Sequence, residues 1–145
     1  MTTGRICVRE IDIAAPTDSV QAVAQRMHSR KVGAIVVQDF ARKPIGIVTD
    51  RDLAIRVVGQ ARDPGRTCVR DVMTRSPVTT REDTPLEESL RLMRRGSFRR
   101  LPVVDNAGCL VGLVTLDDIL QLLSEEFVQI GQLLEDESPS SLATP

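Results

Sequence analysis

Apolar residues recur at helical spacing near the start of the chain and then gather into two short runs. Val20, Val23 and Met27 would lie on one face of a helix. The apolar runs Ala34–Val37 and Ile45–Val48 follow, separated by the turn-forming stretch QDFARKP. This order predicts a helix followed by a β-hairpin.

The same order of polar and apolar positions returns in the second half of the chain. Leu86, Leu90 and Met93 recur at helical spacing, and the apolar runs Leu101–Val104 and Leu110–Val114 flank the turn DNAG. A second helix is predicted after each hairpin, and a short strand before each first helix. The predicted short strands are Ile11–Ala14 and Val78–Thr80. Each half is therefore predicted to have the order β-α-β-β-α.

The two halves are copies of one unit. A shift of 66 positions places the octapeptide GIVTDRDL on GLVTLDDI, so that Thr49 matches Thr115 and Asp52 matches Asp118. Over the 34 positions that begin at Val20 and Leu86, eight residues are identical and no gap is needed. Internal duplication accounts for this agreement.

We therefore predict an α+β (α/β-like) fold of two repeats, with boundaries at residues 1–62 and 63–124. Each copy has more apolar faces than it can cover alone, so the copies should pack pseudo-symmetrically, sheet to sheet. Residues 125–135 would extend the last helix, and their apolar side chains would either close the core or contact another subunit. Residues 136–145 are polar and rich in Pro and Ser, which predicts a disordered tail.

Composition narrows the class of protein. Of 145 residues, 41% are hydrophobic and 27% are charged, as in globular proteins, and the net charge of −1 disfavours a nucleic-acid or membrane surface. No apolar run approaches the roughly 20 residues of a membrane span, and the first ten residues lack the apolar stretch of a signal peptide. Three scattered cysteines fit a reducing compartment, so we expect a cytoplasmic protein.

The repeated G-x-x-T-x-x-D pattern has two interpretations. In the simpler one, the threonine and aspartate form a capping box at a helix start, which contributes roughly 1 kcal/mol. In the other, the open helix N-terminus binds a phosphate and the aspartate accepts hydrogen bonds from a ribose diol. The glycine would then leave room for the ligand. Both interpretations stay open at this point.

Two further segments, VRDVM at 69–73 and FRRLPVVD at 98–105, make a family resemblance specific. Together with the two T-x-x-D motifs, they make the chain resemble a tandem pair of cystathionine beta-synthase (CBS) domains, called a Bateman module. The resemblance covers about 120 of the 145 residues. It implies that adenosine-containing ligands (AMP, ADP, ATP, NAD or S-adenosylmethionine) bind in clefts between the repeats. It also implies a homodimer and a regulated partner protein.

The resemblance implies roles for residues that match the family pattern. Asp52 and Asp118 would hold ribose hydroxyls. The phosphate-binding residues would be Thr49, Thr115, Arg51, Arg99 and Arg100. The adenine pocket would comprise Ile11, Ile13, Ala14, Val78, Thr79, Thr80, Ile47 and Leu113. Because Gly33 and Ala34 stand where the second repeat has its two arginines, the clefts are unequal, and we expect one tight site and one weak or empty site.

The predicted function is a nucleotide sensor that signals to a partner through altered repeat packing. Neither catalysis nor a metal site is predicted, because no nucleophile–base pair, acidic dyad or ligand-spaced cysteines are visible. One alternative is a structural dimerisation module with empty clefts. The other is nucleic-acid binding through the arginine-rich segment Arg91–Arg100, which the slightly acidic net charge disfavours.

Overall fold

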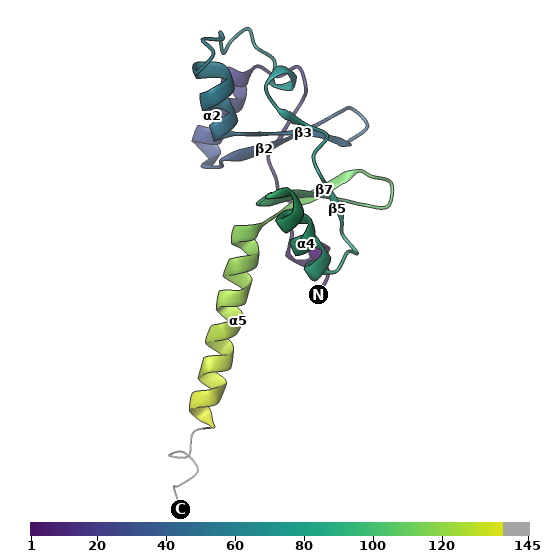
Figure 1. Cartoon of the computed structure of the whole chain (residues 1–145), viewed down its shortest axis with the longest axis vertical. Helices are drawn as coiled ribbons and strands as arrows, with labels where there is room; N and C mark the ends of the chain where they lie inside the picture. Colours follow the sequence, from purple (N-terminus) through teal and green to yellow (C-terminus); the bar gives the residue numbers. More distant parts are fainter. Residues whose placement is uncertain (138–145) are drawn as a thin grey trace, which may run out of the picture.

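A computed structural model describes residues 1–137 and has the predicted α+β order (Figure 1). The first repeat contains α1 (Thr3–Ile6), β1 (Ile13–Ala14), α2 (Val20–Arg30), β2 (Ala34–Gln38), β3 (Pro44–Thr49), α3 (Asp50–Leu53) and the π-helical turn η1 (Ala54–Val58). The second contains the 3-10 turn η2 (Val69–Asp71), β4 (Thr74–Arg75), β5 (Thr80–Arg81), α4 (Leu86–Gly96), β6 (Arg100–Val104), β7 (Leu110–Thr115) and α5 (Leu116–Asp136).

The strands form two sheets with the same internal topology. The first sheet has the order β1-β2-β3-β4 and the second β5-β6-β7. In each, a short parallel strand precedes an antiparallel hairpin. The hairpins even share a register shift at equivalent positions, between Val37 and Gln38 and between Val103 and Val104. The duplication seen in the sequence is therefore also present in the backbone.

The two short first strands lie later in the chain than predicted. β1 covers only the end of the predicted strand Ile11–Ala14, and β5 overlaps the predicted strand Val78–Thr80 only at its last residue. Ile13 pairs with Val36, and Thr80 pairs with Val103. Pairing begins there because the residues just before each strand cross from one sheet to the other and have no full strand beside them.

The segment that leads into each repeat packs on the other repeat. Val8 forms a β-bridge with Leu113, and β4 pairs with β3. Ile6 contacts the core of the second repeat, whereas Val69 and Val72 are fully buried in the core of the first. We call these two parts of the chain, residues 1–8 and 68–75, the exchanged segments.

Buried hydroxyl groups anchor the first exchanged segment. The Thr3 hydroxyl donates to the carbonyl of Thr84 at 2.9 Å and lies 2.7 Å from the Ser89 hydroxyl. Ser89 lies in turn 2.8 Å from the hydroxyl of Thr80. These three hydroxyl-bearing side chains are buried, so each needs the others as hydrogen-bond partners. The network fixes α1 against α4 and β5.

The motif glycines make room for the exchanged segments. A Cβ atom at Gly112 would lie 2.7 Å from the carbonyl oxygen of Val8 and 2.9 Å from the Cys7 sulfur. A Cβ atom at Gly46 would collide with the side chain of Met73. Protein atoms fill the space beside both glycines, so the interpretation that they leave room for a ligand is wrong. Burial raises the pKa of the Cys7 thiol, which therefore stays uncharged at neutral pH.

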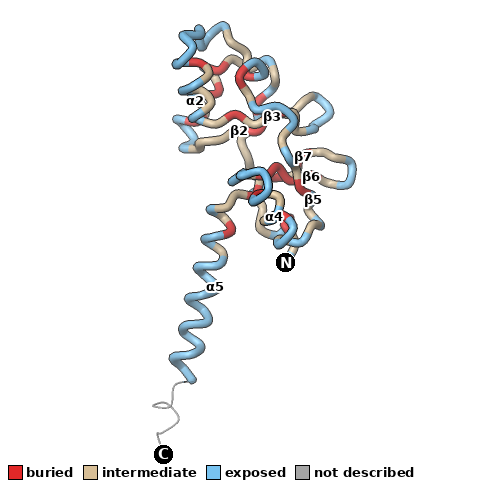
Figure 2. Tube along the Cα trace, viewed as in Figure 1, coloured by how far each residue is buried: buried red, intermediate tan, exposed pale blue. Residues whose placement is uncertain are grey.

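The last helices of the two repeats differ. α3 passes into η1, where the N–H of Gly59 donates to the carbonyl of Ala54, five residues back, and the helix ends. α5 is instead one continuous helix of 21 residues that projects from the rest of the molecule (Figure 1). Every residue from Leu123 to Glu137 is exposed (Figure 2), so the apolar side chains of 125–135 do not close this chain's core. Neither α5 nor another described helix is long and apolar enough to cross a membrane.

The disordered tail was predicted to begin at residue 136, but Asp136 is the last residue of α5. Residues 138–145 of that predicted tail lie outside the described residues.

The glycine contacts predict unequal effects of two matched substitutions. Gly112→Ala should lower the free energy of unfolding by about 1–3 kcal/mol, because the new methyl group meets backbone that cannot easily move. Gly46→Ala should cost less, because the flexible side chain of Met73 can shift. Urea unfolding of the two variants and the wild type measures both values. Equal losses would contradict the role given to the exchanged backbone at Gly112.

Candidate ligand-binding clefts

Two cavities lie between the repeats, each beside one T-x-x-D motif. The Asp118 cleft, of about 250 Å³, is lined by Val8, Glu10, Ile11, Asp12, Val32, Gly33, Ala34, Arg100, Leu113, Thr115 and Asp118. The Asp52 cleft, of about 200 Å³, is lined by Ile47, Thr49, Asp52, Thr74, Pro77, Val78, Phe98, Arg99 and Arg100. Each combines the motif of one repeat with the segment that leads into the other.

The two clefts are related by the repeat of 66 residues. The equivalent lining pairs are Leu113 and Ile47, Thr115 and Thr49, Asp118 and Asp52, Val8 and Thr74, Ile11 and Pro77, Asp12 and Val78, Val32 and Phe98, Gly33 and Arg99, and Ala34 and Arg100. Matched positions of the two repeats therefore line both cavities, although Glu10 lines the Asp118 cleft and its counterpart Ser76 does not line the Asp52 cleft.

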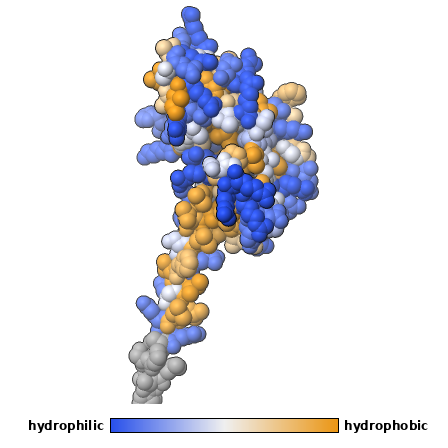
Figure 3. All heavy atoms as spheres, in the orientation of Figure 1, coloured by the Kyte–Doolittle hydropathy of each residue, from blue (hydrophilic) through white to orange (hydrophobic). Residues whose placement is uncertain are grey.

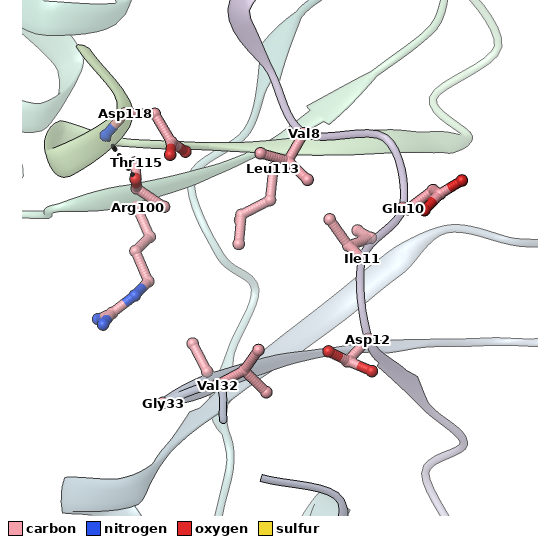
Figure 4. A pocket seen from close by; sticks show the side chains of 11 residues that line it. Val8, Glu10, Ile11, Asp12, Val32, Gly33, Arg100, Leu113, Thr115 and Asp118 are labelled. Atoms are coloured by element: carbon pink, nitrogen blue, oxygen red, sulfur yellow. Dashed lines mark hydrogen bonds between the residues drawn. The ribbon is translucent and has the colours of Figure 1, made fainter. Parts of the chain in front are cut away.

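The polar side chains of the Asp118 cleft lie at opposite ends of the cavity (Figure 4). Arg100, Thr115 and Asp118 lie together, where β6 and β7 meet the start of α5. Glu10 and Asp12 lie at the other end, on the chain that crosses to β1. Apolar side chains lie between the two ends. This arrangement suits an elongated ligand with polar groups and a flat apolar part.

The capping box forms at one motif and only half forms at the other. The Asp52 N–H donates to the Thr49 hydroxyl at 3.2 Å, and the Thr49 N–H donates to the Asp52 carboxylate at 2.9 Å. At the second motif, the Asp118 N–H donates to the Thr115 hydroxyl at 3.1 Å. Within residues 1–137, no bond returns from the Thr115 N–H to the Asp118 carboxylate. The Asp118 carboxylate therefore keeps its acceptor oxygens for a ligand.

The two clefts differ in the sign of their charge. The Asp118 cleft has three carboxylates and the single guanidinium of Arg100, although Asp12 is paired with Arg30. The Asp52 cleft has one carboxylate and two guanidiniums. One of these, on Arg99, lies 3.4 Å from Asp117, but both side chains are mostly exposed, so this ion pair is weak. The two clefts are therefore unequal in charge: carboxylates predominate in the Asp118 cleft and guanidiniums in the Asp52 cleft.

Some of the residues predicted to bind ligand line neither cleft. The predicted residues that do line the Asp118 cleft are Ile11, Arg100, Leu113, Thr115 and Asp118. The predicted residues that line the Asp52 cleft are Ile47, Thr49, Asp52, Val78, Arg99 and Arg100. The remaining predicted residues are Arg51, Ile13, Ala14, Thr79 and Thr80. Ile13 and Ala14 line a separate hollow beside Phe40, and Thr80 is buried against Ser89.

Several lining residues were not predicted from the sequence. In the Asp118 cleft they are Val8, Glu10, Asp12, Val32, Gly33 and Ala34, and in the Asp52 cleft they are Thr74, Pro77 and Phe98. The repeat could have indicated two of them, because Gly33 and Ala34 are the counterparts of Arg99 and Arg100, which were predicted to bind ligand. Val8 and Thr74 belong to the exchanged segments, and a repeat alignment does not reveal that they cross to the other repeat.

The fold and the clefts together define a duplicated α+β module, in which the two pseudo-symmetric repeats form two equivalent cavities between them. The family model of the CBS domain matches residues 4–59 and 69–125. The chain therefore belongs to the CBS domain family, as a tandem pair, and the sequence-based assignment is confirmed.

The chain spans only part of the relatives it matches. It is 37% identical over 122 residues to the uncharacterized protein MK0525 of Methanopyrus kandleri. The matched stretch covers 84% of this chain and 62% of MK0525. It covers 18% and 21% of two CBS domain-containing proteins of Arabidopsis thaliana. The family relation therefore concerns the paired domains.

Two solved structures similar to this chain contain adenosine compounds. CBSX2 in complex with AMP is 28% identical, has a TM-score of 0.74 and matches over 86% of this chain and 96% of that one. The CBS domain pair of protein MJ0100, in complex with 5′-methylthioadenosine and S-adenosyl-L-methionine, is 25% identical with a TM-score of 0.77, over 87% and 98% of the two chains.

The unequal capping bonds predict unequal stability effects. Asp52→Ala should lower the free energy of unfolding by about 1 kcal/mol, because it removes the bond to the Thr49 N–H. Asp118→Ala should cost clearly less, because its carboxylate makes no such bond. Both variants can be compared by thermal unfolding without ligand. A larger loss for Asp118→Ala would show that its carboxylate has a structural role.

Proposed function

We propose that this CBS pair is a regulatory module that binds an adenosine-containing ligand between its repeats, and not an enzyme. The observation that carries the proposal is the grouping of Thr115, Asp118 and Arg100 around an open cavity, with the Asp118 carboxylate uncommitted. The adenosine complexes of CBSX2 and MJ0100 support the ligand class. AMP, ADP, ATP, NAD and S-adenosylmethionine are the candidates.

The chemistry of the cleft suits each part of such a ligand. The two ribose hydroxyls would donate to the Asp118 carboxylate. At the polar end of the cavity, the Thr115 hydroxyl and the Arg100 guanidinium can donate to oxygen atoms of the ligand. The adenine ring would lie against Ile11 and Leu113, which offer aliphatic surface across the middle of the cavity.

Signalling would follow from the position of the clefts between the repeats. Each cleft is lined by an exchanged segment or its continuation, so a ligand contacts chain that is anchored in both cores. A ligand that binds one packing of the repeats more tightly than another shifts the population toward it. A regulated partner protein in the cytoplasm would read that change.

A purely structural dimerisation module is the second candidate function. The complete capping box of Thr49 and Asp52 favours it, because there the motif residues already satisfy each other. In that case both clefts would stay empty and the motif would serve only to start helices. The two candidates differ in whether adenosine compounds stabilise the fold.

We also propose that the module is a homodimer through α5. Leu120, Leu123, Phe127, Ile130 and Leu134 recur at alternating intervals of three and four, and all are exposed. This is the spacing of a helix–helix seam. The orange apolar side of α5 lies next to the blue surface over α4 in Figure 3. A second copy would cover the apolar residues, which the family's usual homodimer also implies.

Charge complements this apolar seam. Residues 116–137 contain acidic residues and no Lys or Arg, so two α5 helices alone would repel each other. Arg91, Arg94 and Arg95 on α4 are exposed, and no ion pair engages them within residues 1–137. Pairing α5 of one copy with α4 of the other would neutralise both surfaces, and a two-fold axis would make the contact twice.

Ligand binding can be tested by thermal unfolding with adenine and guanine nucleotides, NAD and S-adenosylmethionine. An adenosine ligand at 100 times its dissociation constant should add about 2.7 kcal/mol of stability. Asp118→Asn, which keeps the shape of the side chain, should reduce the shift that a ligand of the Asp118 cleft produces, because it removes one of the two oxygens that accept from the ribose. If no adenosine compound stabilises the wild type, the structural module is the correct function.

The dimer can be tested by sedimentation velocity on the full chain. Phe127→Glu should shift the protein to monomer, because it places a charge in the seam. Val128→Glu is the matched control, since Val128 is also exposed and apolar but lies off the seam. Equal dissociation by both variants, or a wild type that is monomeric at high micromolar concentration, would contradict the proposed seam.

A further inference from the structure

We infer that the two clefts bind adenosine compounds of different charge. The Asp52 cleft takes a phosphorylated one, such as ATP. The Asp118 cleft takes one without phosphate, such as adenosine or an adenosine carrying a 5′-sulfonium group. This inference rests on the proposed function and deepens it, because it assigns a ligand class to each cleft.

The equivalent positions of the clefts carry opposite chemistry. Where the Asp52 cleft has Arg99 and Arg100, the Asp118 cleft has Gly33 and Ala34. Where the Asp118 cleft has Asp12, the Asp52 cleft has Val78. Because these positions match in the two repeats, their different side chains give the two clefts opposite preferences for ligand charge.

A phosphate in the Asp118 cleft would meet more negative than positive charge. Asp12 is partly neutralised by Arg30, but neither Glu10 nor Asp118 has an ion-pair partner among residues 1–137. Repulsion by these carboxylates offsets the attraction of Arg100. A neutral nucleoside avoids that repulsion, and a sulfonium cation is attracted by the same carboxylates.

Arg100 lines both clefts, and its single guanidinium cannot bind a phosphate in each at once. In the Asp52 cleft Arg99 supplements it, whereas Arg100 is the only cationic side chain among the described residues that line the Asp118 cleft. Arg99 is free to turn to a phosphate, because its ion pair with Asp117 is exposed and weak. A phosphorylated ligand in the Asp52 cleft therefore removes the one cation that the other cleft could use.

The hydrogen bonds made by Asp52 and Asp118 agree with this assignment of one ligand class to each cleft. A ligand without phosphate depends on its ribose and base for affinity, so it needs an uncommitted carboxylate. Asp118 supplies one, whereas Asp52 already accepts from the Thr49 N–H and lies 3.8 Å from Arg56. A phosphorylated ligand draws most of its affinity from charged hydrogen bonds, which the Asp52 cleft supplies through its arginines.

Isothermal titration calorimetry of the full chain with ATP, adenosine and S-adenosylmethionine tests the inference. Arg99→Gln should weaken ATP about tenfold and leave S-adenosylmethionine unchanged. Glu10→Gln should weaken S-adenosylmethionine several-fold and leave ATP unchanged or slightly tighter. Asp118→Asn should weaken adenosine while ATP is retained. Arg99 and Glu10 are both exposed, so neither substitution disturbs packing, and unchanged melting temperatures of the free variants check this.

The contrary outcomes are distinct. If Arg99→Gln and Glu10→Gln alter the affinity for ATP and S-adenosylmethionine by the same factors, the charge assignment is overturned and the proposed function stands. The same holds if ATP fills both clefts of the wild type with equal affinity. If none of the three compounds binds, the inference falls, and the proposed function is decided by the thermal-unfolding test with the full set of nucleotides.

Discussion

The reciprocal exchange of residues 1–8 and 68–75 is the constraint on which the rest of the structure depends. Each segment completes the other repeat: Val69 and Val72 fill the first core, and Ile6 contacts the second. Both motif glycines exist because this chain passes close to β3 and β7. The crossing also creates the clefts, since the residues that leave one sheet for the other form one wall of each cavity. Core, motif and candidate site therefore share one physical origin.

The duplicated backbone determines the fold, and the side chains that differ between the repeats determine the chemistry of each cleft. The shared register shift and the matched lining positions show that duplication preserved the geometry of the fold. The substitutions at Gly33, Ala34, Asp12 and their counterparts changed only charge and volume at the cavity walls. Such positions can diverge with little effect on stability, because they lie outside the buried clusters. A duplicated scaffold can thus hold two cavities with different chemistry.

The sequence predicted the fold from features that are local or periodic. The hairpins and helices follow from apolar spacing, and the 66-residue repeat follows from direct comparison. The exchange could not be predicted, because nothing in Val8 or Val69 indicates which repeat it packs on. The positions of β1 and β5 were displaced for the same reason. Which cleft Arg99 and Arg100 belong to also could not be predicted, because each cleft is lined by both repeats. Glu10 and Asp12 were not predicted to line a cleft, because a short strand was expected at Ile11–Ala14, where the chain crosses.

The hydroxyl network at Thr3 has a consequence for synthesis of the protein. Thr3 finds its partners at Thr84 and Ser89, which lie 81 and 86 residues later in the chain. Thr3 therefore leaves the ribosome well before the surface that it packs on has been made. Until then α1 and Cys7 have no core to join, and long-range closure of this kind is slow. The first repeat alone cannot give a finished domain during translation, so completion of the fold waits for the second.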